Sequence, residues 1–355
     1  MDQAKKSKSE INEKLESMSE IDKELNDIKS SFYKDYYIWL KQKESSCKHG
    51  NLFTDGVSST RNSSSIKEQP KANRVETESE LPDHKIHGFV NDILFLNNYL
   101  LKQKESKKFK TLAIVGQYGV GKTTLCQSVF NDAEVKRAYR PRIWVSMFSK
   151  ETKEDEDPKI DVVKRILRSL GVEDELLERI KTETEEEKRS KDEAGEREDG
   201  IVKEKELSRL LNALHLNLIG KKYLIVLDDV SEDSEWNQQE KSNLSCGFPK
   251  GFGGRVIVTT RDERLAKKIV GEEENLQRLF PRSDAESIWK IYQDAVEANA
   301  GNAEALKVNL RYPGSIKQEL MDKSCGVPLA ARMLAKIEPV ELEQNEGNMD
   351  RKKSV

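Results

Sequence analysis

A short glycine-rich segment beginning at residue 116 constrains the fold of this chain more than any other feature. Residues 112–115 are the apolar run Leu-Ala-Ile-Val, and the sequence GQYGVGKT follows at once, from Gly116 to Thr123. The next residues, Thr123–Phe130, have a helical pattern. Glycines at these positions permit a tight turn that most side chains would hinder. The segment therefore predicts a buried strand, a sharp loop and a helix in direct succession.

Each residue type in this loop suits the binding of phosphate groups. Gly119 and Gly121 allow backbone N–H groups to surround phosphate oxygens, and the helix N-terminus adds the positive end of its dipole. Lys122 supplies a point charge for β and γ phosphates, and the Thr123 hydroxyl can ligate Mg²⁺. We expect the cofactor to be bound by Gly116, Gly119, Val120, Gly121, Lys122, Thr123 and Thr124.

Continuous apolar runs elsewhere in the chain predict the rest of a sheet. Runs that do not alternate with polar residues are typical of parallel strands buried on both faces. Helical stretches, such as Asp161–Leu170, separate these runs. We therefore predict an α/β fold with a parallel sheet covered by helices on both faces. The predicted strands are Thr111–Val115, Arg142–Ser146, Tyr223–Leu227 and Arg255–Thr259.

Charged residues follow two of these strands at their carboxyl ends, the edge where open α/β sheets bind ligands. We expect Asp228 to hold Mg²⁺ directly or through water, and Asp229 to orient and deprotonate an attacking water. Taken alone, such a pair of aspartates would fit a turn cap equally well. Arg261 is placed to contact a γ-phosphate. The alternative for Arg261 is a surface ion pair with Asp262 or Glu263.

The regions around this core differ from it in pattern. Apolar residues between Ile11 and Trp39 recur about every 3.5 positions, which predicts an amphipathic helix that packs on its own protein or mediates self-association. The stretch after it is rich in Ser, Lys, Glu and Asn, as flexible linkers are. We predict an amphipathic helix over 1–45, a linker over 46–84, a nucleotide-binding domain over 85–280, a helical subdomain over 281–338 and a disordered tail over 339–355.

The helical subdomain is predicted from three helical segments after residue 281. They cover Ala285–Ala300, Ser315–Ser324 and Pro328–Ile337. Gly326 can serve as a C-terminal cap, and Pro328 suits a first helical position.

Charge is abundant but nearly balanced. Lys and Arg number 61 against 64 Asp and Glu, which argues against a nucleic-acid binder. Residues 173–206 hold 15 acidic and 8 basic residues, so we expect a solvated insertion with at most a frayed helix, interrupted by Gly195 and Gly200. No apolar run approaches the ~18 residues of a membrane helix. The scattered cysteines and few histidines predict no zinc site and a reduced, intracellular chain.

The order of these motifs resembles the NB-ARC module of plant disease-resistance (NLR) proteins, in the STAND class of P-loop NTPases. The resemblance extends over residues 86–335 and implies binding of ADP or ATP with Mg²⁺. It also implies an ARC1-like helical subdomain, in which Pro328 packs near the base or sugar. The matching segments are GQYGVGKTTL, RIWVSMFSK, KKYLIVLDDV, GGRVIVTTR, LQRLFPRSDAESIWKIYQDA and CGVPLAARMLA.

The chain departs from the family pattern at several positions. Phe89 stands where an arginine is usual, Ser231 where a tryptophan is usual, and Val327 where a leucine is usual. After Ile337 we find no second ARC subdomain, no Met-His-Asp motif and no leucine-rich repeats. The resemblance is therefore to a truncated member of the family.

These observations predict a cytoplasmic ADP/ATP-binding switch or regulator in plant defence signalling, with slow or absent ATP hydrolysis. Its partners are expected to be other proteins, such as full-length NLR proteins or a second copy through residues 1–45, and not nucleic acid or membrane. An alternative is a nucleotide-locked helical adaptor that binds but does not cycle nucleotide. A third, less favoured, is a nucleotide kinase or metabolic P-loop enzyme, against which stands the lack of an evident acceptor-substrate lid.

Overall fold

The computed structural model describes seven stretches of the chain: residues 75–101, 107–149, 157–192, 199–231, 244–271, 273–299 and 314–337. They belong to two compact units, one spanning Val75–Arg282 and the other containing the residues from Ser283 onward. The predicted helix over 1–45, most of the linker over 46–84 and the tail over 339–355 lie outside the described residues.

The first unit is built on a parallel sheet, which confirms the predicted fold class. The strands follow one another across the sheet in the order β2-β3-β4-β1-β5, and every neighbouring pair is parallel. Four strands coincide closely with the predicted ones, whereas β5 was not predicted. The strands are β1 (Lys110–Val115), β2 (Arg142–Ser146), β3 (Leu224–Val230), β4 (Arg255–Thr260) and β5 (Leu276–Arg278).

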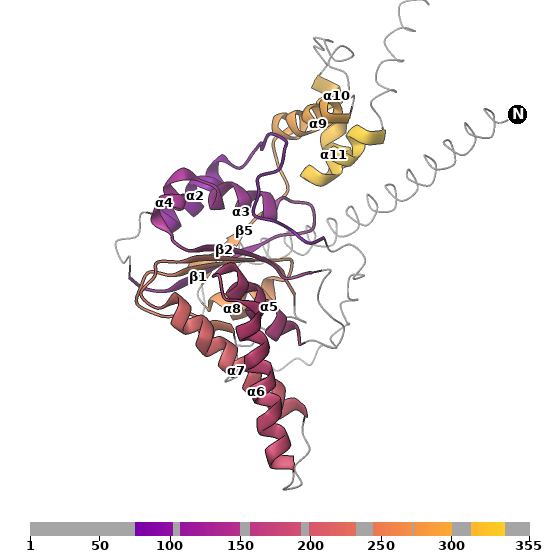
Figure 1. Ribbon diagram of the computed structural model, residues 1–355. Helices are drawn as coiled ribbons and strands as arrows, with labels where there is room; N and C mark the ends of the chain where they lie inside the picture. The colour runs from indigo at the N-terminus through magenta and orange to yellow at the C-terminus, as the bar shows by residue number, and fades with distance from the viewer. Residues whose placement is uncertain are drawn as a thin grey trace, which may run out of the picture. The chain divides into compact units, whose positions relative to one another are not determined.

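Helices cover both faces of this sheet, as predicted (Figure 1). On β3, Leu224 and Val226 face one hydrophobic cluster, while Ile225 and Leu227 face another, so the strand is buried on both sides. The first face carries α2 (Val90–Leu101), α3 (Lys122–Phe130) and α4 (Ala133–Ala138), and the second carries α5 (Pro158–Ser169), α7 (Asp199–Leu218) and α8 (Glu263–Val270). Short 3₁₀ turns, η3 (Leu244–Gly247) and η4 (Glu273–Asn275), precede β4 and β5.

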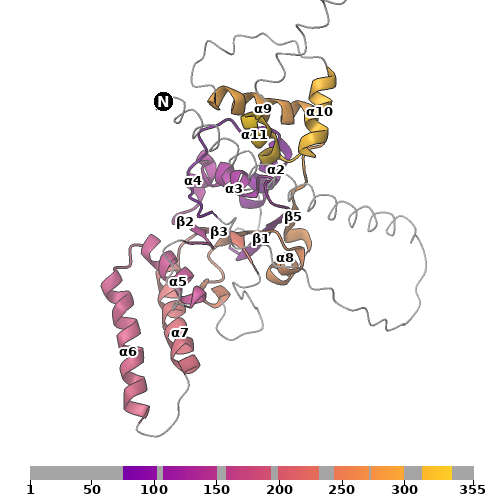
Figure 2. The ribbon, with the colours of Figure 1, turned by 90° about the vertical axis from the view of Figure 1, so that its right-hand side faces the viewer.

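The charged segment 173–206 is more helical than expected, although most of its described side chains are exposed. It forms α6 (Asp174–Asp192) and the first part of α7, which lie side by side in Figures 1 and 2. Leu177 is buried in α6, and Leu207 is buried just beyond the segment in α7, so both helices contribute to the core of the first unit. Apolar residues at helical spacing therefore outweigh the high charge of the segment.

The second unit consists, in its described part, of α9 (Ala285–Asn299), α10 (Gly314–Ser324) and α11 (Pro328–Ile337). Trp289 and Tyr292 stack in α9 with their ring centroids 5.6 Å apart. The Lys317 ammonium of α10 pairs with Glu286 of α9 at 2.6 Å. Cys325 and Gly326 both take positive φ after α10, and Pro328 is the first residue of α11. Within the described ranges, no helix is long and apolar enough to cross a membrane.

Candidate functional site

The loop between β1 and α3 has the backbone geometry that its glycines predicted. Gly119 has a φ of 76° and Gly121 a φ of 99°, both in the left-handed region. A Cβ on Gly121 would lie 2.6 Å from Cζ of Phe89, so this position has neither the conformation nor the space for a side chain. Gly121 is also the N-cap of α3 and offers no side-chain cap. The first-turn N–H groups of α3 are therefore available to an anion.

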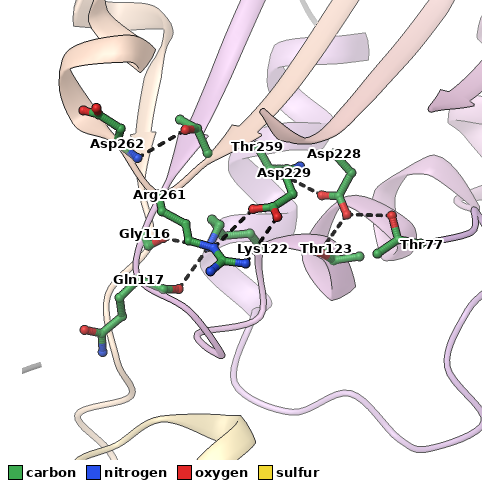
Figure 3. A network of polar contacts seen from close by, with 11 residues as sticks. Thr77, Gly116, Gln117, Lys122, Thr123, Asp228, Asp229, Thr259, Arg261 and Asp262 are labelled. Atoms are coloured by element: carbon green, nitrogen blue, oxygen red, sulfur yellow. Dashed lines mark hydrogen bonds and ion pairs between the residues drawn. The ribbon is translucent and has the colours of Figure 1, made fainter. Parts of the chain in front are cut away.

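Lys122 begins α3 and lies beneath this loop. Its side chain is buried, and its Nζ donates hydrogen bonds to the carbonyl oxygens of Gly116 at 2.7 Å and Gln117 at 3.0 Å (Figure 3). Burial lowers the pKa of Lys122 to about 8, and the nearby Arg261 guanidinium acts in the same direction. An ammonium held in so dry an environment interacts strongly with any anion that enters the loop.

Asp228 is the acceptor at the centre of a hydroxyl network. Its carboxylate is fully buried at the end of β3. Oδ1 accepts a hydrogen bond from Thr259 Oγ1 at 2.6 Å, while Oδ2 accepts one from Thr123 and one from Thr77, each at 2.9 Å. Burial raises the pKa of Asp228, and these three hydroxyls oppose that rise by stabilising the carboxylate. The structure thus joins the helix-start threonine to the strand-end aspartate, the two residues predicted to hold Mg²⁺.

Asp229 and Arg261 form an ion pair beside Lys122. Arg261 Nε lies 3.2 Å from Asp229 Oδ1, and Arg261 Nη2 donates a hydrogen bond to Asp229 Oδ2 at 3.2 Å. The guanidinium also stacks 4.7 Å from the ring centroid of Tyr118, in the loop itself. The predicted alternative, a pair with Asp262 or Glu263, is not what these contacts show, because Asp262 instead caps the N-terminus of α8.

An irregularity in the pairing of β3 with β4 explains why the side chains of Asp228 and Asp229 both face the loop. The pairing of β3 with β4 shifts register between Leu227 and Val230, and Asp229 takes a φ of 61°. The Asp229 N–H donates to Thr259 Oγ1 at 2.8 Å. Consecutive side chains of a regular strand would point to opposite faces, but this bulge allows both carboxylates to face the loop.

Thr77 contacts the predicted Mg²⁺ ligand Asp228 from outside the phosphate-binding loop, and no motif in the sequence indicates this contact. It lies in the predicted linker, and its Oγ1 accepts a hydrogen bond from Trp144 Nε1 at 3.3 Å. The next two residues are attached to α3, since Gln127 donates to the Glu78 carbonyl and Asn131 to the Ser79 carbonyl. The end of the predicted linker is therefore hydrogen-bonded to the first unit.

Phe89, which departs from the family pattern, packs on the loop. The ring is buried, and Arg282 places its guanidinium carbon 3.8 Å from the ring centroid. Arg282 also donates to the Gly88 carbonyl and lies 3.5 Å from an Asp92 carboxylate oxygen. Arg282 therefore places a guanidinium next to residue 89, the position where an arginine is usual in the family. Because Arg282 is far from residue 89 in the sequence, the sequence alone does not indicate this contact.

The residues brought together fit a nucleotide phosphate with Mg²⁺. The glycine loop, Lys122, Thr123 and Asp228 converge, whereas Pro328 lies in the second unit and its role stays a prediction. Among the described residues, no cluster of three or more His, Cys, Asp or Glu side chains could hold a metal by itself. An ion here would therefore need phosphate oxygens or water to complete its coordination, as Mg²⁺ commonly does.

Comparison with known proteins agrees with this geometry. The chain is 71% identical over its whole length to the probable disease resistance protein At4g19060 of Arabidopsis thaliana, and the match covers all of that protein. It is 50% identical to At5g45440 of the same species, over 78% of this chain and 81% of that one. Disease resistance RPP13-like protein 4, also from Arabidopsis thaliana, is 30% identical over 72% of this chain, which spans 25% of that protein.

A solved structure shows a more distant likeness. Cdc6p from Pyrobaculum aerophilum has 15% sequence identity and a TM-score of 0.42, covering 76% of this chain and 65% of that one. Residues 91–301, more than half of the chain, match the NB-ARC domain. With that match and a relative that is similar from end to end, the chain belongs to the NB-ARC family of plant disease-resistance proteins.

Proposed function

We propose that this protein binds ADP or ATP with Mg²⁺ and acts as a nucleotide-dependent switch or regulator in plant defence signalling. One observation supports the proposal most: Thr123, at the start of α3, donates to the buried carboxylate of Asp228 at 2.9 Å, next to the buried Lys122. A hydroxyl, a carboxylate and an ammonium at the N-terminus of a helix are what a Mg²⁺-nucleotide needs. The relatives named as disease resistance proteins support the role in defence.

The residues of the loop would divide the binding between them. The N–H groups of the loop and of the first turn of α3 would take the phosphate oxygens. Lys122 would exchange its hydrogen bonds to the Gly116 and Gln117 carbonyl oxygens for hydrogen bonds to phosphate oxygens. The exchange is favourable because a hydrogen bond between an ammonium and an anionic phosphate is stronger than one to a neutral carbonyl. Thr123 and Asp228 would hold Mg²⁺, which supplies positive charge to neutralise the phosphates.

The ion pair between Asp229 and Arg261 bears on hydrolysis. In the ion pair, Asp229 and Arg261 are bound to each other. The ion pair must break before Asp229 can act as a base towards water and before Arg261 can bind a γ-phosphate. We therefore propose slow hydrolysis. The same ion pair favours the second candidate, a nucleotide-locked adaptor in which the pair stays closed and residues 1–45 provide the activity.

The proposal extends to location and partners. We place the protein in the cytoplasm, with other proteins as its partners. Full-length NLR proteins, or a second copy of this chain through residues 1–45, are the candidates. The near balance of 61 basic and 64 acidic residues offers little attraction for nucleic acid.

Binding is tested by titrating the nucleotide-free protein with ADP in the presence of Mg²⁺, using calorimetry. We expect micromolar or tighter affinity for the wild type and a loss of at least about tenfold for Lys122→Met, because a charged hydrogen bond to phosphate is removed. Lys110→Met, at the opposite end of β1, is the control and should bind as the wild type does. Equal affinity in all three proteins would contradict the assignment of the site.

Hydrolysis is tested by single-turnover release of phosphate from ATP. Slow release by the wild type that Asp229→Asn abolishes, with unchanged ATP affinity, is the result expected of a switch. Binding without any release, in both the wild type and the variant, would instead support the nucleotide-locked adaptor.

A further inference from the structure

Residues 75–80 lie along the first unit as a strap without regular secondary structure. Thr77 Oγ1 donates to Asp228 Oδ2 at 2.9 Å. Two side chains of α3 fix the backbone behind Thr77: Gln127 Nε2 donates to the Glu78 carbonyl at 2.8 Å, and Asn131 Nδ2 donates to the Ser79 carbonyl at 2.6 Å. Figure 3 shows Thr77 reaching Asp228 from the side opposite to Arg261 and Lys122. The strap thus connects the sequence before the domain to the predicted Mg²⁺ ligand.

The hydroxyl of Thr77 is oriented by its surroundings. Trp144 Nε1 can only donate, and it lies 3.3 Å from Thr77 Oγ1. The oxygen of Thr77 therefore accepts from the indole, and its proton is directed at Asp228 Oδ2. The hydroxyl acts as a donor to the carboxylate and not as an oxygen ligand that faces a cation.

The acceptor positions of Asp228 are nearly full. A carboxylate oxygen can accept about two hydrogen bonds, and Oδ2 already accepts those of Thr123 and Thr77. Oδ1 accepts that of Thr259. Mg²⁺ keeps several of its waters when it binds beside a phosphate, and those waters need acceptors. With Thr123 bound to Oδ2 from within the site, the position that a Mg²⁺-bound water would take on this oxygen is occupied by Thr77.

We propose that the strap and Mg²⁺-nucleotide compete for Asp228 Oδ2, so that Mg²⁺ loading releases residues 75–80 from the first unit. This inference rests on the proposed nucleotide site and describes how that site is regulated. In the sequence the strap directly follows residues 1–74, so its release would free the segment at which those residues enter the first unit.

The strap is held in a way that suits reversible release. Its ends bury little apolar surface, since Val75 is 67% exposed and the adjoining Leu81 is 50% exposed. The contacts of Thr77, Glu78 and Ser79 with Asp228 and α3 described above are hydrogen bonds, which water can replace at small net cost. A segment held by apolar burial would be much harder to displace by a local exchange at one carboxylate oxygen.

The first test compares full-length Thr77→Val, which has the same shape but no hydroxyl, with Thr77→Ser, which keeps the hydroxyl. The measured quantity is the gain in ADP affinity that Mg²⁺ produces over EDTA. We expect Thr77→Val to enlarge this gain by about threefold to tenfold, the effect of one hydrogen bond, and to leave affinity in EDTA unchanged. Thr77→Ser should match the wild type. An unchanged or smaller gain in Thr77→Val would overturn the inference, because Thr77 would then be indifferent to Mg²⁺ or assist it.

The second test needs only the wild type, so it stands even where a variant folds poorly. A glutamate-specific protease can cut after Glu76, Glu78 and Glu80 once the strap leaves the domain. We expect faster cutting there with ADP and Mg²⁺ than with ADP and EDTA, while cutting elsewhere stays the same. Equal rates would overturn the inference but leave nucleotide binding standing. A wild type that binds no ADP under either condition would refute the proposed function and this inference together.

Discussion

Replacing Gly121 by alanine tests the packing of the glycine-rich loop between β1 and α3 against Phe89. The residue has a φ of 99°, and an added Cβ would lie 2.6 Å from Cζ of the buried Phe89 ring. Holding alanine in the left-handed conformation destabilises the folded state by about 1–2 kcal/mol. Alanine also lowers the conformational entropy of the unfolded chain, which offsets a few tenths of a kcal/mol of this loss. Overpacking against the ring adds about 1–3 kcal/mol. We expect Gly121→Ala to lower the free energy of unfolding by about 2–4 kcal/mol in all.

Two comparisons separate these contributions. Gly171→Ala is the matched control, because Gly171 has a φ of 85° but no atom within 4 Å of its added Cβ, so it should lose about 1 kcal/mol. In a Phe89→Ala background, Gly121→Ala should also cost only about 1 kcal/mol, since the clash is gone. Urea unfolding of the wild type, Gly121→Ala, Phe89→Ala and the double variant gives the coupling energy between residues 89 and 121. Equal costs of Gly121→Ala with and without Phe89 would refute the packing described here.

Two other predictions concern the charges of the site. The pKa of Lys122 is lowered to about 8, so in the nucleotide-free protein most of the Lys122 side chains are uncharged above pH 8. Binding of the ADP phosphates requires the charged ammonium. ADP affinity should therefore fall about eightfold between pH 7.5 and 9, with proton uptake on binding that calorimetry in two buffers detects; a flat profile would contradict the burial of Lys122. Thr259→Val should lower the free energy of unfolding by about 1–3 kcal/mol, because Asp228 Oδ1 and the Asp229 N–H lose their shared partner. Urea unfolding measures this loss, and a change below about 0.5 kcal/mol would show that water replaces the hydroxyl at no cost.

The strands that the sequence predicted are those with continuous apolar runs. Arg142–Ser146 is an example in which prediction and structure agree at both ends. β5 escaped prediction because it is three residues long and partly polar. Its Gln277 bonds to Asp92, and its Arg278 to Glu263, so contacts across the fold hold it at the edge of the sheet.

The helical content of residues 173–206 was underestimated because the high charge of the segment hides the helical spacing of its apolar residues. Its 15 acidic residues suggest a solvated stretch, yet Leu177 and Thr184 are buried seven positions apart, two turns of one helix face. Of the two glycines expected to interrupt a helix, Gly200 lies inside α7 (Asp199–Leu218), and Gly195 lies outside the described residues. A few buried positions suffice to attach a highly charged helix to a core.

The centre of the site was predictable because its residues occur in local motifs. The loop fixes Lys122 and Thr123 next to each other, and a strand end fixes Asp228. Thr77 is 151 positions from Asp228 in the sequence and lies in a stretch without any pattern, so no local signal marks it. The ion pair of Asp229 with Arg261 also depends on a sheet irregularity that composition does not reveal.

The central proposal is that the loop, Lys122, Thr123 and Asp228 bind a nucleotide. The most direct measurement is to release and identify the small molecules that purify with the protein, and to titrate the stripped protein with ADP. We predict ADP or ATP in stoichiometric amount with the wild type and none with Lys122→Met. Wild-type protein that carries no nucleotide and has no micromolar affinity for added ADP or ATP would contradict the account.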